Sequence, residues 1–505
     1  MLQQNSYKDE RYCRWMRSSQ DSTSVIRLIS AVVVMFAFST FSKESVTMLL
    51  ILVVAGINVW KLLRVKYKKP LVMTRRAWRI YSMDCALSLI FITVILSLMD
   101  NSMVTETLFN ISVISLTLFF LSHEVTLAAN WLLKPVERSI NNRYYRDAQG
   151  ILAGMPDLKV IGITGSYGKT STKHYLYRIL SEKYDTVMTP GSFNTTLGVV
   201  RTVREHLKPY TQVFIVEMGA KQQGDIKEIC DLVHPTAAII TAVGEQHLES
   251  FKSIENVQRT KFELADSLPT DGFLVINNDF PYIANRQVDN VKVSRYAVND
   301  IDDADYIVSD IQYGVNGSEF TLKTPECENL RFHTRLVGEC NVSNLAAAVI
   351  MALHLKVPVE KIRYAVEKIE QVEHRLQLKR TPGGVTILDD AFNSNPHGSA
   401  MALDVLASMK GGKRIVITPG MIELGARQEQ LNREFGEKIA KSVDVAIIVG
   451  KYNRDAIVGG LTEGNLDVTQ IRTVDSFAEA QALLHTMLSP GDTVLYENDL
   501  PDTFK

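Results

Sequence analysis

The residues best suited to chemistry in this chain lie in one stretch, 158–173, which reads LKVIGITGSYGKTSTK. Its apolar run, Val160 to Ile163, predicts a short buried strand, and the apolar spacing of the HYLYRIL segment that follows predicts a helix. Between them lies a glycine-containing turn that opens the helix. The residues of this turn are Gly165, Ser166, Tyr167, Gly168, Lys169, Thr170 and Ser171.

A strand, a glycine turn, a Lys-Thr pair and a helix form the arrangement that cradles phosphate groups. Glycine lets backbone N–H groups approach phosphate oxygens, and the helix N-terminus adds the positive end of its dipole. We expect Lys169 to reach the β- and γ-phosphates of ATP and the Thr170 hydroxyl to ligate Mg²⁺. The strict motif has its first glycine at position 163. This chain has Ile163 at that position and Gly162 one residue earlier. A plain helix-capping turn is the alternative interpretation.

Three buried-strand patterns farther along the chain end in polar side chains. VFIVEMGA contains Glu217, AAIITAVG is followed shortly by His247, and FLVINND contains Asn277. Strand-like and helix-like runs alternate through residues 156–372, which indicates an α/β fold with a parallel sheet. Because ligands of such sheets bind at the carboxyl ends of the strands, we expect these side chains beside the glycine turn.

Length and charge limit the function classes. A chain of 505 residues is long enough for about two to four domains. Its net charge of −1 creates no overall field that attracts nucleic acid, and no nucleic-acid partner is expected. The five cysteines, at positions 13, 85, 230, 327 and 340, have no paired spacing. That pattern argues against a disulfide scaffold or a zinc site and favours a reducing compartment for the soluble part.

Four apolar stretches precede residue 150, at about 25–41, 46–63, 77–98 and 106–122. Each approaches the roughly 20 residues that a helix needs to cross a bilayer, so they predict a four-helix transmembrane domain in contact with membrane lipid. Buried helices of a soluble domain are the alternative interpretation.

Basic residues flank these stretches unevenly. They precede the first stretch, lie between the second and third, and follow the fourth, whereas the loop between the third and fourth has no Lys or Arg. By the positive-inside rule, both termini are expected in the cytoplasm. The chain is therefore predicted to be a multi-pass protein of the cytoplasmic membrane with its catalytic domains in the cytoplasm.

Further motifs carry a resemblance to a known family. TGSYGKTSTK, SFNTTLG, VEMGAKQQGDI, HPTAAIITAVGEQHLESFKS and RTKFEL occur in this order, followed by DDAFNSNP and IELG. Together they resemble the Mur ligases, the ATP-dependent amino-acid and peptide ligases of bacterial cell-wall synthesis. EMGA, GDI, DDAFNSNP and IELG are most similar to the branch that joins D-alanyl-D-alanine to the UDP-muramoyl tripeptide.

The resemblance implies how the α/β part is divided. It places a P-loop central domain with a parallel sheet at 149–372 and a C-terminal Rossmann-like ligase domain at 373–505. The strand–loop–helix rhythm of the last third of the chain also favours a Rossmann-like unit. The predicted membrane domain, 1–148, stands where the family has a soluble domain that binds the UDP-sugar.

The family match implies a magnesium site. Thr170 and Glu217 supply the hard oxygen ligands that Mg²⁺ prefers. His247 would help to hold a second ion, and Lys261 matches the family lysine that is carbamylated, which turns a cation into an anionic ligand. Taken alone, His247 is better interpreted as a hydrogen-bonded loop histidine and Lys261 as a solvated helix lysine. The expected catalytic residues are Lys169, His247, Lys261 and Arg375.

The same match implies the nucleotide contacts. Asn341 and Asn344 would face the adenine. Arg375 would reach the phosphates, and Asp389 would accept hydrogen bonds from the ribose hydroxyls. Without the resemblance, the asparagines could equally be an N-terminal helix cap, and Asp389 a solvated strand end. Cys340 stands where the family has a histidine.

The implied activity is ATP-dependent formation of an amide bond through an acyl phosphate, adding D-alanyl-D-alanine to a muramoyl tripeptide. The loop with Asn393, Asn395 and Pro396 would meet the incoming amino component, a dipeptide or amino acid. The final GDTVLYENDLPDTFK lacks the Lys-Gly-Ser-Arg run expected in this branch. One alternative is therefore a Mur-type ligase or amidating enzyme that acts on another envelope polymer or a lipid-linked acceptor. Another is a membrane nucleotide-sensing or transport module.

Overall fold

The computed structural model describes most of the chain after residue 117 and parts of the chain before it. The described ranges are 1–5, 7–18, 70–98, 117–298, 303–314, 317–326, 328–392 and 394–499, with the single positions Val53, Gly56, Ile57, Trp60, Arg64, Ile111 and Ile114. The chain forms two compact units, and the boundary between them falls between Arg143 and Tyr144.

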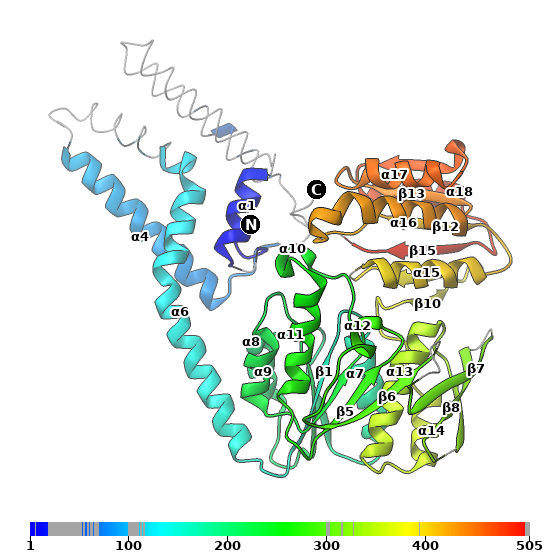
Figure 1. Cartoon of the computed structure of the whole chain (residues 1–505). Coiled ribbons are helices and arrows are strands. Elements are labelled where there is room, and N and C mark those ends of the chain that lie inside the picture. Colours follow the sequence, from blue (N-terminus) through cyan, green and yellow to red (C-terminus); the bar gives the residue numbers. More distant parts are fainter. Residues whose placement is uncertain are drawn as a thin grey trace. The chain divides into compact units, whose positions relative to one another are not determined.

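The first unit is helical where it is described (Figure 1). Its helices are α1 (Asp9–Ser18), α4 (Arg75–Leu98) and the first part of α6 (Ser122–Ala153). Tyr12 and Trp15 are buried together with Leu133 in a small apolar core. The Arg79 guanidinium donates two hydrogen bonds to the Glu137 carboxylate, at 2.6 and 2.9 Å, and so fastens α4 to α6.

The predicted localisation as a multi-pass membrane protein is contradicted, and the predicted four-helix transmembrane domain is not shown by the described residues. Of the four apolar stretches, 77–98 lies wholly within the described residues and forms α4. Among the helices that the structure describes, α4 alone is long and apolar enough to cross a membrane, by length and composition. A single helix of that kind is not a multi-pass domain. The stretch 25–41 lies outside the described residues, as do most of 46–63 and part of 106–122.

The second unit contains a nine-stranded sheet in the order β2-β3-β1-β4-β5-β6-β7-β8-β9. The strands are β1 (Lys159–Thr164), β2 (Thr186–Met188), β3 (Val213–Glu217), β4 (Ala237–Ile240), β5 (Phe273–Asn277), β6 (Lys292–Ala297), β7 (Tyr306–Gly314), β8 (Gly317–Lys323) and β9 (Asn329–Thr334). Pairing is parallel from β2 to β7 and antiparallel from β7 to β9. The carboxyl ends of β1, β3, β4 and β5 therefore meet along one edge of the sheet.

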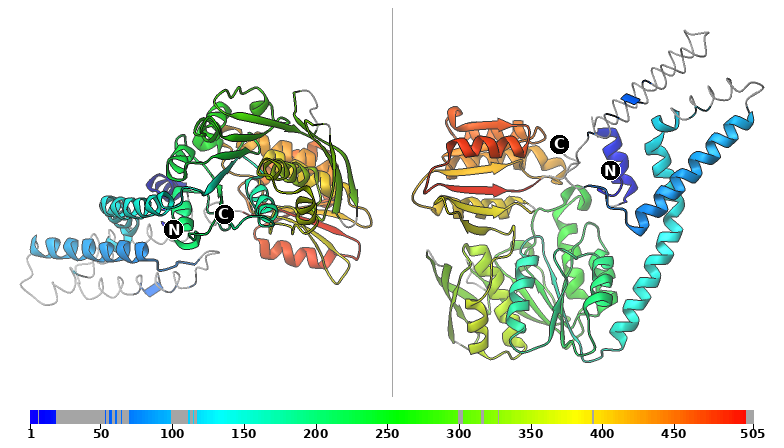
Figure 2. Two further views of the ribbon diagram at one scale, coloured as in Figure 1. Left: turned by 90° about the horizontal axis from the view of Figure 1, so that it is seen from below. Right: turned by 180° about the vertical axis from the view of Figure 1, so that it is seen from behind.

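Helices cover both faces of this sheet (Figures 1 and 2). They are α7 (Lys169–Leu180), α8 (Thr196–His206), α9 (Asp225–Val233), α10 (Leu248–Phe251), α11 (Ile254–Asp266), α12 (Pro281–Ala284), α13 (Glu339–His354) and α14 (Val359–Glu367). Successive β1 side chains alternate between the two cores. Ile161 and Ile163 pack with α7 and α13, whereas Val160 packs with α8, α9 and α11. Burial on both faces explains why these strands are continuous apolar runs.

A six-stranded sheet follows, in the order β10-β11-β15-β12-β13-β14. Its strands are β10 (Gln377–Arg380), β11 (Thr386–Asp390), β12 (Arg414–Thr418), β13 (Val445–Val449), β14 (Ile471–Val474) and β15 (Thr493–Glu497). Its helices are α15 (Pro396–Ser408), α16 (Gln428–Ser442), α17 (Arg454–Glu463) and α18 (Phe477–Met487), with the short η1 (Gly425–Arg427) and η2 (Val468–Gln470). β10 is antiparallel and the other strands are parallel. The predicted α/β architecture, a parallel central sheet and a Rossmann-like C-terminal sheet, is confirmed.

Candidate active site

The glycine turn joins β1 to α7 and requires glycine at two positions. Gly165 and Gly168 have φ of +153° and +76°, a range that side chains strongly disfavour. A Cβ on Gly165 would lie 2.1 Å from the Thr241 hydroxyl oxygen, and one on Gly168 would lie 2.2 Å from Asn344 Oδ1. The turn therefore packs directly against the segment that contains Thr241 and against Asn344 of α13.

Lys169, the first residue of α7, folds its side chain back over this turn. Its Nζ donates hydrogen bonds to the carbonyls of Gly165 (2.5 Å) and Ser166 (3.3 Å). Burial, reinforced by Arg375 and opposed by Glu217, lowers the Lys169 pKa to about 8. Ser166 in turn is tied through its hydroxyl to the backbone of Gly244. The ammonium group is thus held against two backbone carbonyls of the glycine turn.

Glu217, at the end of β3, is the buried carboxylate of the site. Its side chain is 1% exposed, and it accepts hydrogen bonds from Thr170 Oγ1 (3.1 Å), Asn194 Nδ2 (3.1 Å) and Lys173 Nζ (3.0 Å). Burial opposes ionisation, but Lys173 and then Lys169 lower the pKa of Glu217 below its usual value. Glu217 is therefore an anion held in a fixed orientation beside Thr170.

Basic side chains outnumber this carboxylate. Lys173 is fully buried, and Lys261 of α11 is 2% exposed. Burial, and next the charge of Lys169, lower the pKa of Lys261 well below its usual value. Arg375 approaches from the C-terminal sheet and interacts electrostatically with Lys169 and Glu217. Basic groups gathered in a buried region disfavour one another's charged forms, so a polyanion such as a triphosphate would stabilise them.

His247 joins this group from the loop after β4. Its Nδ1 lies within hydrogen-bonding distance of the Glu423 carboxylate, which belongs to the C-terminal sheet. Burial lowers the His247 pKa, with Glu423 opposing and Lys221 and Lys261 adding to the effect. The structure therefore places Glu217 beside the glycine turn, through its hydrogen bond with Thr170, and places His247 against Glu423.

The residues expected around adenine and ribose are already engaged with the protein. Asn341 accepts a hydrogen bond from the Tyr175 hydroxyl (2.8 Å) and donates one to the Val337 carbonyl (2.9 Å). Asn344 lies against Gly168. Asp389 forms ion pairs with His374 (2.9 Å) and Lys379 (2.8 Å). These contacts fasten α13 to α7 and order the end of β11.

The remaining residues predicted for the site are Asn277, Asn395, Pro396, Asn393 and Ser171. Asn277 Nδ2 donates to Ser343 Oγ at 3.1 Å, on the first turn of α13. Asn395 caps α15 by accepting from the Gly398 N–H (2.8 Å), and Pro396 is the first residue of that helix. Asn393 lies outside the described residues. Ser171 is buried in the first turn of α7.

Tyr167, at the tip of the glycine turn, is in contact with the C-terminal domain. Its ring stacks on His397 with centroids 5.7 Å apart and planes at 20°. Phe280 packs edge-on against the same histidine, at 5.2 Å. The turn is therefore supported from both α/β sheets.

Sequence reasoning did not assign roles to Lys173, Asn194, Glu423 and Glu497. Lys173 lies one helical turn after Lys169, a spacing that puts both on one face of α7, and this signal was available. Asn194 and Glu423 lie in the quoted motifs SFNTTLG and IELG, but their partners are distant in sequence. Glu497 is fully buried at the end of β15, where it accepts hydrogen bonds from Ser394 (2.6 Å) and Ser399 (2.9 Å).

The oxygen atoms at the end of β3 fit a magnesium ion. Mg²⁺ holds ligands at 2.0–2.1 Å in an octahedron, so neighbouring ligand oxygens lie about 2.9 Å apart. Thr170 Oγ1 and Glu217 Oε1 are 3.1 Å apart. Within the described ranges, no cluster of three or more His, Cys, Asp and Glu side chains is arranged to hold a metal by itself. Hydroxyl, phosphate and water oxygens would have to complete such a site.

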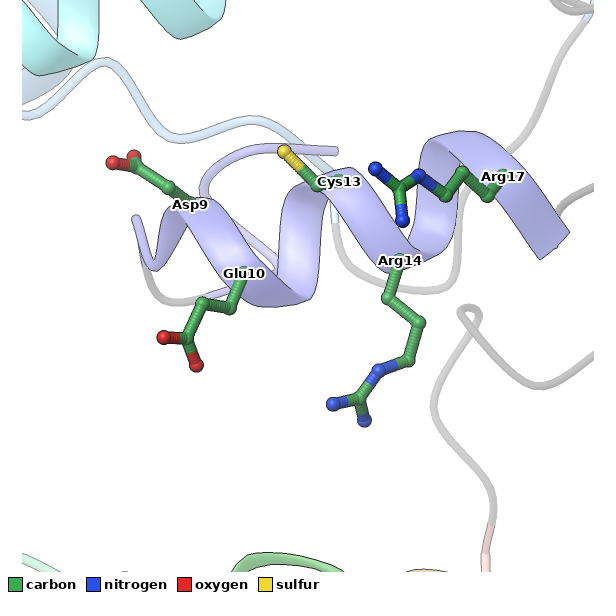
Figure 3. A pocket seen from close by; sticks show the side chains of 5 residues that line it. All are labelled: Asp9, Glu10, Cys13, Arg14 and Arg17. Carbon is green, nitrogen blue, oxygen red and sulfur yellow. The ribbon is translucent and has the colours of Figure 1, made fainter.

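A hollow in the first unit is unrelated to these residues. It has a volume of about 550 Å³ and is lined by Asp9, Glu10, Cys13, Arg14 and Arg17 of α1 (Figure 3). The acidic side chains lie toward the start of the helix and the arginines toward its end, as the helix dipole favours.

Comparison with known proteins identifies the two α/β domains. Residues 163–352 match the Mur ligase middle domain, and residues 374–496 match the Mur ligase glutamate ligase domain. The chain belongs to the Mur ligase family. The predicted resemblance is thereby confirmed. Residues 1–162 lie outside both matched regions.

Relatives of this Mur ligase share its two α/β domains. It is 31% identical to the UDP-N-acetylmuramoyl-tripeptide–D-alanyl-D-alanine ligase of Escherichia coli over 337 residues, 66% of this chain and 74% of the relative. The ligase of the same name from Bacillus subtilis is 29% identical over 344 residues, 67% of this chain and 72% of the relative. The structure of MurF from Acinetobacter baumannii superimposes with a TM-score of 0.64 at 26% identity, covering 71% of this chain and 77% of that one. These relatives are ligases, and α4 is the one described helix long and apolar enough to cross a membrane, so the predicted multi-pass localisation is contradicted.

Proposed function

We propose that this Mur ligase joins D-alanyl-D-alanine to UDP-N-acetylmuramoyl tripeptide in an ATP-dependent reaction. One observation supports this chemistry. The basic side chains of Lys169, Lys173, Lys261 and Arg375 gather around the turn, where Thr170 Oγ1 and Glu217 Oε1 lie 3.1 Å apart. The names of the relatives at about 30% identity support the choice of substrates.

The reaction has two steps. A carboxylate oxygen of the tripeptide attacks the γ-phosphorus of ATP, forming an acyl phosphate as the bond to ADP breaks. The amine of the dipeptide then attacks the acyl carbon, forming the amide bond and releasing phosphate and a proton. Lys169 and Arg375 stabilise the negative charge that spreads over the transferred phosphoryl oxygens. Bound Mg²⁺ would neutralise phosphate charge and orient the triphosphate, with Thr170 and Glu217 as its protein ligands.

We assign adenine contact to Asn344 and Asn341 and ribose contact to Asp389. Asn344 supports this assignment because it lies against Gly168, beside the start of α7. Asp389 is kept ionised by Lys379 and His374, which hold its pKa below its usual value against the effect of burial. An ionised carboxylate is a strong acceptor for two ribose hydroxyls.

Lys261 is proposed to carry a carbamate. Only a neutral amine adds to CO₂, forming an N–C bond and releasing a proton, and burial, followed by the charge of Lys169, lowers the Lys261 pKa in the direction that favours the neutral amine. The resulting carboxylate would add negative charge beside Lys169 and serve as a ligand near His247. Lys261 in its unmodified, charged form would instead increase the repulsion within the pocket.

The carbamate predicts a chemical rescue. Lys261→Ala should lower kcat about 10²-fold or more, and added acetate or formate should restore part of it by supplying the missing carboxylate. Lys261→Arg keeps a cation and cannot be carbamylated, so it should be equally inactive without added acid. Steady-state kinetics with and without acid measure both effects. Wild-type activity in either variant would contradict the assignment.

The substrate assignment is tested by product analysis. The purified chain is incubated with ATP, Mg²⁺ and UDP-muramoyl tripeptide, and with D-alanyl-D-alanine, single amino acids or ammonia. We expect ADP release coupled to a pentapeptide product with the dipeptide alone. Ammonia- or amino acid-dependent product would instead favour a Mur-type ligase for another envelope polymer. That alternative is suggested by the final GDTVLYENDLPDTFK, which lacks the Lys-Gly-Ser-Arg run expected in this branch.

A further inference from the structure

A loop of the C-terminal domain, residues 421–427, docks on residues 244–249 of the central domain. We call it the docking loop. The Glu423 carbonyl accepts a hydrogen bond from the Glu249 N–H at 3.3 Å. Gly425 approaches so closely that a Cβ there would lie 3.3 Å from the Glu249 nitrogen. The two backbones are therefore in direct contact at this point.

The side chains of Glu423 and His247 meet within this contact. His247 Nδ1 lies within hydrogen-bonding distance of Glu423 Oε2, and the two side chains are only 19% and 22% exposed. Lys221 Nζ lies 3.8 Å from the other carboxylate oxygen. Both His247 and Glu423 have left-handed backbones, with φ of +54° and +63°. Non-glycine residues hold such conformations only when surrounding structure enforces them.

A carboxylate at Nδ1 decides which tautomer the imidazole adopts. It accepts the Nδ1–H and leaves the lone pair on Nε2, which is the form that ligates a metal ion. Lys261 lies close enough for its charge to act on His247. His247 is therefore a neighbour of the lysine proposed to carry the carbamate.

We propose that Glu423 is a positioning residue for His247, and that docking of the 421–427 loop completes the metal-binding imidazole. Divalent-ion affinity and contact between the two domains are then linked, because the carboxylate that orients the histidine comes from the other domain. This inference rests on the role that the Mur ligase resemblance implies for His247, which is to help hold a second metal ion.

The competing explanation is a simple interdomain ion pair. The same loop supplies a matched control, because Arg427 forms an ion pair with Glu245 across the same boundary. The Arg427 and Glu245 side chains are 40% and 30% exposed. Arg427→Gln therefore removes an interdomain charge pair and leaves His247 and Glu423 in place.

The test measures Mn²⁺ binding to the full-length chain with a non-hydrolysable ATP analogue, by the electron paramagnetic resonance of free Mn²⁺. Glu423→Ala should weaken binding of the His247-dependent ion about 10- to 100-fold, as for other carboxylates behind a metal-binding histidine. Glu423→Gln should lose less, since its amide oxygen can accept the same hydrogen bond. Arg427→Gln should stay within about twofold of wild type. Thermal unfolding checks that all variants fold.

A double-mutant cycle decides between the explanations. In a His247→Ala background, Glu423→Ala should cause no further loss of Mn²⁺ affinity. An equal loss in both backgrounds, or a loss no larger than that of Arg427→Gln, would overturn the proposal. Unchanged Mn²⁺ affinity in His247→Ala alone would also overturn it. The ligase assignment is judged separately, by formation of the dipeptide-containing product in the wild type.

Discussion

At the scale of single residues, burial sets the charge state of the groups that face the nucleotide. Lys169 and Lys261 have lowered pKa values because both are desolvated; the charge of Arg375 lowers the Lys169 pKa further, and the charge of Lys169 lowers the Lys261 pKa further. Glu217 stays ionised because Lys173 holds it directly. The pocket therefore combines one fixed carboxylate with cations that a triphosphate would stabilise.

Replacement of Lys169 tests the phosphate site. Lys169→Ala should lower kcat/KM by about 10³-fold or more, because the developing phosphoryl charge loses the ammonium held over the turn. Lys227→Ala, an exposed lysine of α9 that pairs with Asp231 on the surface, is the control and should keep wild-type activity. Substantial activity in Lys169→Ala would falsify the phosphate-loop assignment.

Glu497 predicts how stability depends on pH. Burial, followed by the nearby Asp390, raises the Glu497 pKa to about 8 from an ordinary 4.5. Between these values the folded state binds the proton more tightly than the unfolded state, so this residue's contribution to stability is full below pH 4.5 and is lost as pH rises through 8. Glu497→Gln, which resembles the protonated acid, should be more stable than wild type by about 1–3 kcal/mol at pH 9 and similar at pH 5.

Thermal melts of both proteins across this pH range make the comparison. Glu497→Ala serves as control, since it removes the hydrogen bonds from Ser394 and Ser399 and should be less stable at both ends of the range. A difference between wild type and Glu497→Gln that does not change with pH would contradict the assignment.

At the scale of elements, the site depends on how tightly the turn after β1 packs on α13. Gly168 combines a left-handed backbone with contact to Asn344, so the turn can approach the helix only without a side chain. The order strand, turn, helix is local, whereas the close approach of α13, more than 150 residues later, is tertiary.

A glycine replacement separates backbone strain from this contact. Gly168→Ala should weaken binding of an ATP analogue at least about tenfold and destabilise the fold by about 1–3 kcal/mol. Gly224→Ala is the matched control, because Gly224 has a similar φ of +88° and open space around a Cβ. Calorimetric titration should show normal nucleotide affinity in the control. Equal nucleotide affinities in the two variants would mean that the contact with Asn344 is unimportant.

At the scale of the whole molecule, two α/β sheets supply different parts of one pocket. The central sheet provides the glycine turn, Glu217, His247 and Lys261. The C-terminal sheet provides Arg375, whose guanidinium lies 4.4 Å from the centre of the Phe392 ring. A pocket made from two domains can exclude water from an acyl phosphate when the domains are in contact.

Arg375 therefore tests the contribution of the second domain. Arg375→Ala should lower kcat about 10²- to 10³-fold while ADP affinity falls much less, because the guanidinium acts on charge that develops during transfer. Arg375→Lys should recover part of kcat, since it keeps the charge and loses the planar fork. Arg433→Ala, which breaks an exposed pair with Glu463, is the control. A larger effect on ADP affinity than on kcat would assign Arg375 to ground-state binding.

The sequence by itself determined the local parts of this protein. The apolar run before Gly165, the turn and the helix after it depend on residues close together in the chain, and so do the buried strands that end near Glu217 and His247. Parallel pairing then follows from alternating strands and helices, and it brings the strand ends to one edge. Resemblance to family motifs supplied the remaining predicted nucleotide contacts, including those of Arg375 and Asp389.

Tertiary structure decided which side chains meet. Glu423 reaches His247 across 176 residues, and Glu497 meets Ser394 across 103. No periodic pattern encodes such contacts, because they depend on sheet order and on how two domains dock.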